Sequence, residues 1–121
     1  MIKPGVYFIV DLAIAGGKLE AFQAIAQSMV EGTQQEVGAL AYEFYLDSSQ
    51  KQCRLIEIYS DSDAALAHSK GRVVQELVPK LLEVSELTGF SVYGDLSTEA
   101  TELLTQIGAQ LYSSSCGFNR F

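Results

Sequence analysis

The chain has 121 residues, of which 48% are hydrophobic and 19% charged, and its formal net charge is −7. This length and composition indicate one globular domain, spanning residues 1–121, with a buried core, and they exclude a disordered chain. The acidic charge and the eight scattered basic residues argue against nucleic acid as a partner, because phosphate binding needs clustered Lys and Arg.

Membrane and metal partners are not expected either. No apolar run approaches the roughly 20 residues that cross a bilayer. The apolar start resembles a signal peptide superficially, but Asp11 interrupts it and its alternation suits a strand. Cys53 and Cys116 share no metal or redox spacing, so we expect free thiols in a reducing cytoplasm. One histidine and two distant cysteines cannot make a typical zinc site.

The first half of the chain predicts a strand, a helix and a hairpin. Residues 6–14 are rich in Val, Ile, Tyr and Phe, which is typical of a strand, and neither alternating face is clearly polar. From Lys18 to about Gly32 the apolar residues recur at helical spacing. Strands over 38–46 and 52–59 follow, joined by a polar loop. Alternation in the first of these places four apolar residues on one face: Leu40, Tyr42, Phe44 and Leu46.

The second half predicts two helical stretches, a strand and a final helix. Ser60, Asp61 and Ser62 are N-cap candidates for a helix that carries His68 and ends or bends at Gly71. A helical pattern resumes over 73–82, where Pro79 predicts a kink or a new first turn.

The last elements are shorter. Residues 89–93 predict a fourth strand, and Ser97 or Thr98 caps a helix that ends near Gly108. The tail has weak periodicity and three aromatic anchors, Tyr112, Phe118 and Phe121. We expect this tail either to fray or to pack on another surface, such as a second subunit.

The order strand, helix, strand, strand, helix, strand predicts an α+β fold of the ferredoxin-like βαββαβ type. Such a fold is an antiparallel sheet with helices on one face. The first and third strands are apolar on both faces, with Ile9 opposite Phe8 and Ile56 opposite Leu55. A bare second face would leave a large apolar patch, so we expect a homodimer, with residues 95–121 contacting the partner.

Three short patterns between Glu36 and His68 carry a family resemblance. They are Glu36-x-Gly38-x-Leu40-x-Tyr42-Glu43, then Cys53-Arg54-Leu55-Ile56-Glu57-x-Tyr59, then Ser60-Asp61-Ser62-Asp63-Ala64 leading to His68. The sequence resembles the antibiotic biosynthesis monooxygenase-like family of dimeric α/β-barrel proteins, which includes small quinol monooxygenases. The resemblance spans roughly residues 6–92 and implies that two ferredoxin-like domains form a dimeric α/β barrel.

The resemblance implies oxidation of a hydroquinone or another phenolic small molecule by O₂ without a cofactor. Haem-degrading relatives use a Trp, an Asn and a His, whereas this chain has no Trp and its only Asn is Asn119. That difference argues against haem degradation. The alternative is a dimeric small-molecule-binding or stress-associated protein on the same fold, without turnover.

Four residues are candidates for the site. His68 is the only side chain with an ordinary pKa near neutrality, so it is the candidate base; otherwise it is a helix-surface or interface histidine. Glu57 is placed to orient His68, and its alternative is an ion pair with Arg54 or with the partner chain. Tyr59 and Phe22 are the candidate contacts for an aromatic substrate, and their alternative is core packing.

Overall fold

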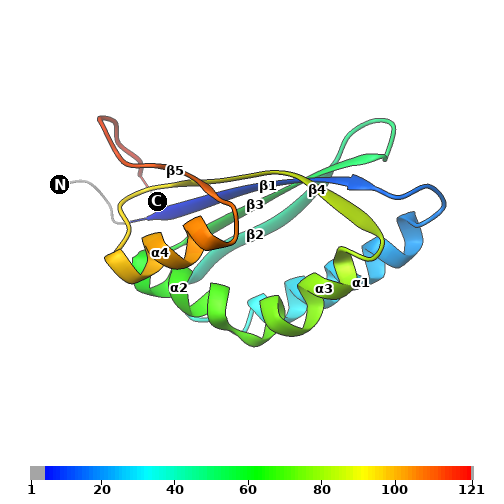
Figure 1. Cartoon of the computed structure of the whole chain (residues 1–121), viewed down its shortest axis with the longest axis horizontal. Coiled ribbons are helices and arrows are strands. Elements are labelled where there is room, and N and C mark those ends of the chain that lie inside the picture. Colours follow the sequence, from blue (N-terminus) through cyan, green and yellow to red (C-terminus); the bar gives the residue numbers. More distant parts are fainter. Residues whose placement is uncertain (1–4, 121) are drawn as a thin grey trace.

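The computed structural model describes residues 5–120, so the predicted anchor Phe121 lies outside the described residues. Its strands are β1 (Val6–Ile14), β2 (Ala39–Leu46), β3 (Gln52–Tyr59), β4 (Ser85–Tyr93) and β5 (Gln110–Tyr112). Its helices are α1 (Leu19–Thr33), α2 (Ser62–Lys70), α3 (Val78–Leu81) and α4 (Thr98–Gln106), with a π-helical turn, η1 (Val73–Leu77), before α3. The helices form one layer against one face of the sheet (Figure 1).

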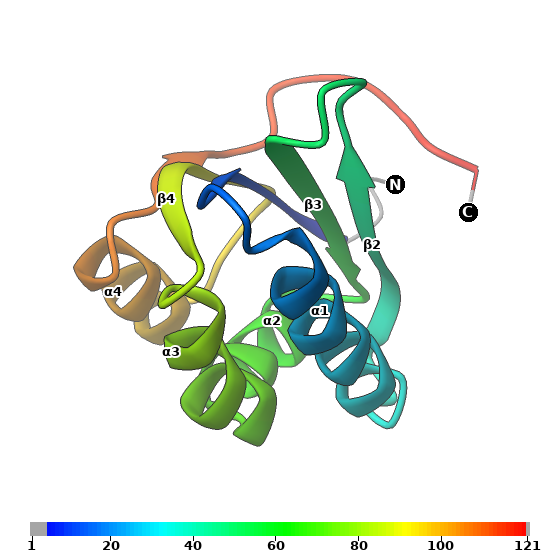
Figure 2. The same ribbon diagram turned by 90° about the vertical axis from the view of Figure 1, so that its right-hand side faces the viewer.

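The sheet has the order β2-β3-β1-β4-β5. Its central strand, β1, runs antiparallel to both β3 and β4, which is the ferredoxin-like arrangement. The end-on view in Figure 2 separates the sheet from the helical layer beneath it. The predicted α+β, ferredoxin-like fold is confirmed. No helix within residues 5–120 is long and apolar enough to cross a membrane.

The two faces of the sheet differ in burial, and this difference follows from strand alternation. On the helix-facing side, Phe8 of β1 and Leu55 of β3 are almost completely buried. On the other side, Ile9 and Ile56 lie opposite one another in the register and remain half-buried. The core and any enclosed site therefore lie between the sheet and the helices.

The helix boundaries agree with the predicted capping residues. Asp61 Oδ1 accepts a hydrogen bond from the backbone N–H of Ala64 at 2.8 Å, so Asp61 is the N-cap of α2. Gly71 ends that helix. Pro79 lies in the first turn of α3, where its missing N–H leaves no helical hydrogen bond unmade. The new first turn predicted at Pro79 is thus confirmed.

Two strand details differ from the sequence prediction. β4 begins at Ser85, not at Gly89, because polar residues at its start hide the strand pattern. The pairing of β2 with β3 shifts register between Ala39 and Ala41, and this bulge turns Leu40 out of the alternation. Leu40 is consequently exposed and does not share the buried face of Tyr42.

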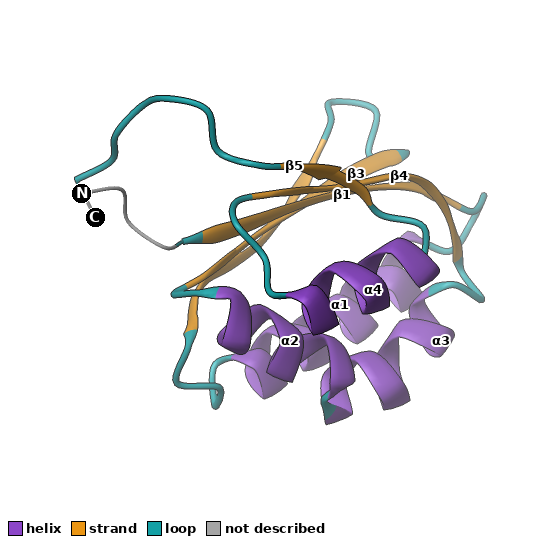
Figure 3. Ribbon diagram, turned by 60° about the vertical axis from the view of Figure 1, so that its left-hand side comes forward, coloured by secondary structure: helices purple, strands orange, loops and turns teal. Residues whose placement is uncertain are grey.

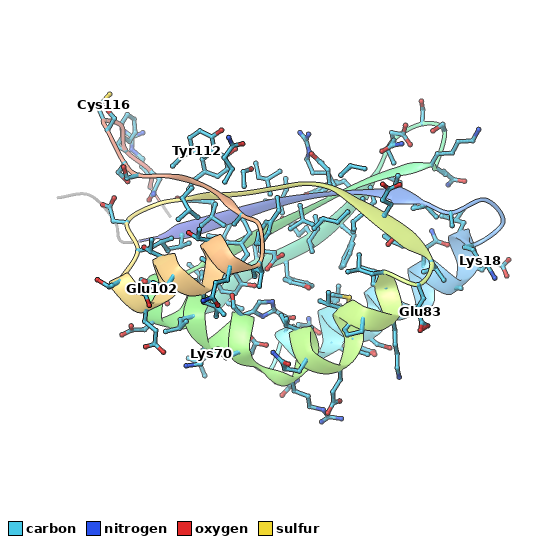
Figure 4. All side chains as sticks on the ribbon, in the orientation of Figure 1. Lys18, Lys70, Glu83, Glu102, Tyr112 and Cys116 are labelled. Atoms are coloured by element: carbon cyan, nitrogen blue, oxygen red, sulfur yellow. The ribbon has the colours of Figure 1, made fainter. Side chains whose placement is uncertain are left out.

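The tail packs on the same chain along part of its length. Its first residues form β5, parallel to β4, and Tyr112 stacks on Tyr93 with ring centroids 5.0 Å apart. Beyond β5 the tail continues as a loop (Figure 3), and Asn119 Nδ2 donates to the Tyr7 hydroxyl at 3.0 Å. Tyr112 and Cys116 lie on the side of the sheet away from the helices (Figure 4). A contact between the tail and a partner subunit stays a prediction.

Candidate functional site

A cavity of about 270 Å³ lies between the sheet and the helices. Four polar side chains, Tyr42, Glu57, His68 and Ser69, reach its wall. The rest of the lining is apolar and comes from β1, β3, β4, α1, η1 and α3: Phe8, Val10, Leu12, Met29, Leu55, Val74, Val78, Leu81 and Phe90. Small-molecule sites are typically apolar with a few placed polar groups, and a volume near their lower limit suits one or two aromatic rings.

The mouth of the cavity is also apolar. Leu82, Leu87 and Ile107 line the cavity and are each between 42% and 48% exposed, so they mark its opening to solvent. Charged residues of the helical layer, such as Lys70 and Glu83, project away from the core (Figure 4). A molecule that enters through this mouth meets aliphatic side chains first and polar groups only inside.

The polar end of the cavity is organised around His68, which α2 presents toward β3. The imidazole is only 3% exposed. Its Nε2 lies 3.5 Å from Glu57 Oε1, and its Nδ1 lies 2.8 Å from Oε1 of Glu36, in the loop after α1. The Tyr59 hydroxyl donates to the same Glu57 oxygen. The histidine therefore lies between two carboxyl groups, one buried and one partly exposed.

Two tyrosines fix the plane of the imidazole. The ring centroids of Tyr59 and Tyr42 lie 5.0 and 5.5 Å from that of His68. Thr33, at the end of α1, lies beside the Tyr42 hydroxyl, but its buried Oγ1 meets no partner at ordinary hydrogen-bond distance. A buried hydroxyl without a partner costs stability, and Thr33 is not among the residues that line the cavity.

Burial controls the charges in this cluster. It raises the pKa of Glu57 to about 8, although the hydrogen bond from Tyr59 opposes the shift. Burial lowers the pKa of His68, while the hydrogen bond and negative charge of Glu36 act in the opposite direction. Burial and the charge of Glu57 raise the pKa of both Tyr42 and Tyr59. At neutral pH the cavity thus presents a neutral imidazole beside a mostly protonated carboxyl group.

Comparison with known families assigns the chain to one of them. The sequence model of the family described as antibiotic biosynthesis monooxygenase matches residues 5–80, which is more than half of the chain. The chain belongs to the antibiotic biosynthesis monooxygenase family. The matched residues include β1 to α2 and therefore His68, Glu57 and Glu36. No sequence among curated proteins matches the chain.

Several solved structures share the fold. MupZ from Pseudomonas fluorescens is 23% identical, with a TM-score of 0.81 over 96% of this chain and 94% of that chain. A structure described as antibiotic biosynthesis monooxygenase is 23% identical, with a TM-score of 0.64 over 72% and 92%. A conserved protein from Methanosarcina mazei Go1 is 19% identical, with a TM-score of 0.68 over 75% and 92%. At these identities the likeness concerns the fold alone.

In this member of the monooxygenase family, three of the four predicted site residues come together. His68 and Glu57 line the cavity, and Tyr59 lies behind them, fully buried against both. Phe22 does not reach the cavity: it packs edge-on against Phe44, with centroids 6.2 Å apart, between α1 and β2. The helical stripe that contains Phe22 is long, and only its later part, at Met29, reaches the cavity wall.

The alternative ion pair of Glu57 with Arg54 does not form. Arg54 Nε lies 2.7 Å from Asp11 Oδ1, on the face of the sheet away from the helices. Because Arg54 and Glu57 are three residues apart in one strand, their side chains point to opposite faces. Glu57 is therefore left with Tyr59 and His68 as its neighbours.

Two site residues were missed from sequence. Glu36 lies in the loop after α1, where no periodicity signals a role, although it begins the family pattern. Tyr42 follows the apolar alternation of its strand, as a core-packing residue would. Only the tertiary structure shows that its ring lies beside His68. Among residues 5–120, no group of three or more His, Cys, Asp or Glu side chains is arranged to hold a metal ion.

Proposed function

We propose that this protein is a monooxygenase that oxidises a hydroquinone or another phenolic molecule of one or two rings with O₂, without a metal, flavin or haem. The observation that carries the proposal is His68, beside Glu57, on the wall of a mostly apolar cavity. Family membership supports the reaction class, and the geometry of the cavity supports the class of substrate.

The cavity favours binding of a flat, apolar ring and activation of its hydroxyl group. The apolar walls bury the ring, while Glu57 and His68 are the polar groups that a phenolic hydroxyl meets at the inner end. A neutral imidazole accepts the phenolic proton, as a general base does. The resulting phenolate is electron-rich and reacts with O₂, which is small and apolar enough to share the cavity.

The reaction balances without a further reductant. A hydroquinone and O₂ give a hydroxyquinone and water: one oxygen atom is inserted at a ring C–H bond, and the other leaves with the two hydroxyl hydrogens. The ring supplies all four electrons that O₂ accepts. His68 takes one phenolic proton first and later returns it to the oxygen that leaves as water.

Oxygen consumption and isotope labelling test this proposal. With a panel of one- and two-ring hydroquinones, we expect protein-dependent oxygen uptake above the rate of autoxidation in buffer. With ¹⁸O₂, the product should gain one labelled atom. Ligand binding without uptake would support the alternative of a binding protein, and hydrogen peroxide without label in the product would indicate an oxidase. Either outcome contradicts the proposal.

We further propose that the chain forms a homodimer through the face of the sheet that the helices leave uncovered. This face carries Ile9, Ile56 and Ile58, which are half-buried within one chain, and the exposed Tyr45. Burying such a surface against a twofold copy removes apolar area from water.

Light scattering tests the dimer. We expect a mass twice the 13.2 kDa of one chain at micromolar concentration, and a shift toward the monomer when Ile56→Asp places a charge at the centre of this face. Ser28→Asp, on the exposed side of α1, is the matched control and should leave the mass unchanged. A wild-type mass near 13.2 kDa contradicts the dimer.

A further inference from the structure

His68 has a second carboxylate partner on the side of its ring that faces away from Glu57. Glu36 Oε1 lies 2.8 Å from His68 Nδ1, and the two residues come from segments on either side of the β2–β3 hairpin. We propose that Glu36 is the positioning residue of this site: it holds the tautomer of His68 that leaves Nε2 free for the substrate, and it stabilises the imidazolium that forms when the substrate loses its proton. The role in turnover rests on the function proposed above.

The tautomer follows from the hydrogen-bonding capacity of the two groups. A neutral imidazole has one N–H, and an ionised carboxylate can only accept. The 2.8 Å contact therefore places the hydrogen on Nδ1, which donates to Glu36. Nε2 is left with its lone pair, on the side of the ring where Glu57 and the cavity lie.

The charge that stabilises the imidazolium comes from Glu36, because the other groups around the ring are neutral at pH 7. Burial raises the pKa of Glu57 to about 8, and it raises the pKa of the Tyr42 and Tyr59 hydroxyls as well. The contact with Glu36, in contrast, opposes the effect of burial on the pKa of His68.

Glu36 and Glu57 differ in how far their carboxyl groups are exposed to solvent. The Glu36 side chain is 29% exposed and lines an open groove of about 700 Å³ between α1, the loop after it and α2, whereas the Glu57 side chain is 6% exposed. Water in the groove therefore reaches the Glu36 carboxyl group, whereas the Glu57 carboxyl group is shielded from it. The nearby Arg72 and Glu76 pair with each other at 2.9 Å, in the same groove.

The proton transfer from the phenol to His68 is balanced. The phenolic O–H bond breaks and an N–H bond forms at Nε2, while the hydrogen on Nδ1 stays in its bond to Glu36. An imidazolium–carboxylate pair thus replaces a neutral imidazole beside a carboxylate. The Nε2 proton later passes to the oxygen that leaves as water, which restores the starting tautomer.

Two variants separate the hydrogen bond from the charge. Glu36→Gln keeps a carbonyl oxygen that accepts from Nδ1 but removes the charge, and Glu36→Leu removes both. Glu76→Gln is the matched control, because it lines the same groove without contacting His68. Since Glu36 is partly exposed, we expect all three variants to fold, and circular dichroism checks this.

Nitrogen NMR of His68 in the substrate-free protein is the first measurement, and it does not depend on turnover. We expect wild-type His68 to carry its hydrogen on Nδ1, Glu36→Leu to lose this preference, and both Glu36 variants to have a lower His68 pKa than the wild type. A wild-type hydrogen on Nε2, or an unchanged His68 pKa in Glu36→Gln, overturns the inference.

Turnover is the second measurement. For Glu36→Gln we expect kcat to fall about tenfold, and the acid limb of the pH–rate profile to move to lower pH with the His68 pKa. Glu76→Gln should change neither. If the wild type oxidises no hydroquinone but the NMR result holds, the proposed reaction fails and the positioning of His68 by Glu36 stands. An unmoved acid limb in an active Glu36→Gln variant overturns the role in turnover.

Discussion

Replacing His68 with alanine is expected to lower kcat for hydroquinone oxidation by at least about 100-fold, while the protein remains folded. The variant removes the one basic side chain on the cavity wall, an imidazole whose Nδ1 is hydrogen-bonded to the Glu36 carboxylate. Glu57 does not replace it at neutral pH, because burial raises its pKa to about 8 and keeps it mostly protonated. Initial rates of oxygen uptake, corrected for autoxidation, measure the loss.

Two further variants make that result interpretable. His68→Gln keeps a polar side chain of similar size without a base, so it should lose activity as His68→Ala does. Lys70→Ala, two positions further along α2, removes only an exposed ion pair with Glu99 and should remain within about twofold of the wild type. Wild-type activity in a folded His68→Ala would eliminate His68 as the base.

The fold was predictable because its local signals agree with one another. The apolar stripe of α1, the alternation in β1 and β3, and the capping residue Asp61 each specify one element, and their order specifies the topology. The exceptions are positions where pairing overrides pattern. Leu40 alternates correctly in sequence, yet a bulge against β3 turns it outward.

The site was predictable only in part, because its residues are joined by tertiary contacts. His68 stands out chemically as the single histidine, and Glu57 and Tyr59 stand out as polar residues on a buried strand face. Phe22 and Met29 belong to the same helical stripe, and nothing local says which of them reaches the cavity. Glu36 lies 32 residues from His68 in a loop, so only the packing of α2 against that loop reveals the pair.

The buried carboxyl group of Glu57 should make the stability of the protein depend on pH. Its pKa is raised from an ordinary 4.5 to about 8, so between these values the folded state holds a proton that the unfolded state has released. The free energy of unfolding therefore falls as pH rises through this window. His68, whose pKa is lowered by burial, acts in the opposite direction, but only below the unfolded value of about 6.5. Between pH 6.5 and 8 we expect the wild type to lose about 2 kcal/mol.

Glu57→Gln should abolish most of this loss. The glutamine amide resembles the protonated acid but does not titrate, and its oxygen still accepts the hydrogen bond from Tyr59. The variant therefore has no buried proton to lose as the pH rises. Urea unfolding at several pH values measures the slope, and Glu31→Gln, which changes an exposed carboxylate on α1, should retain the wild-type slope. Parallel curves for the wild type and Glu57→Gln would mean that Glu57 is ionised in the folded protein. In that case His68 would lie between two carboxylates, Glu36 and Glu57, and Glu57 would compete with His68 for the phenolic proton.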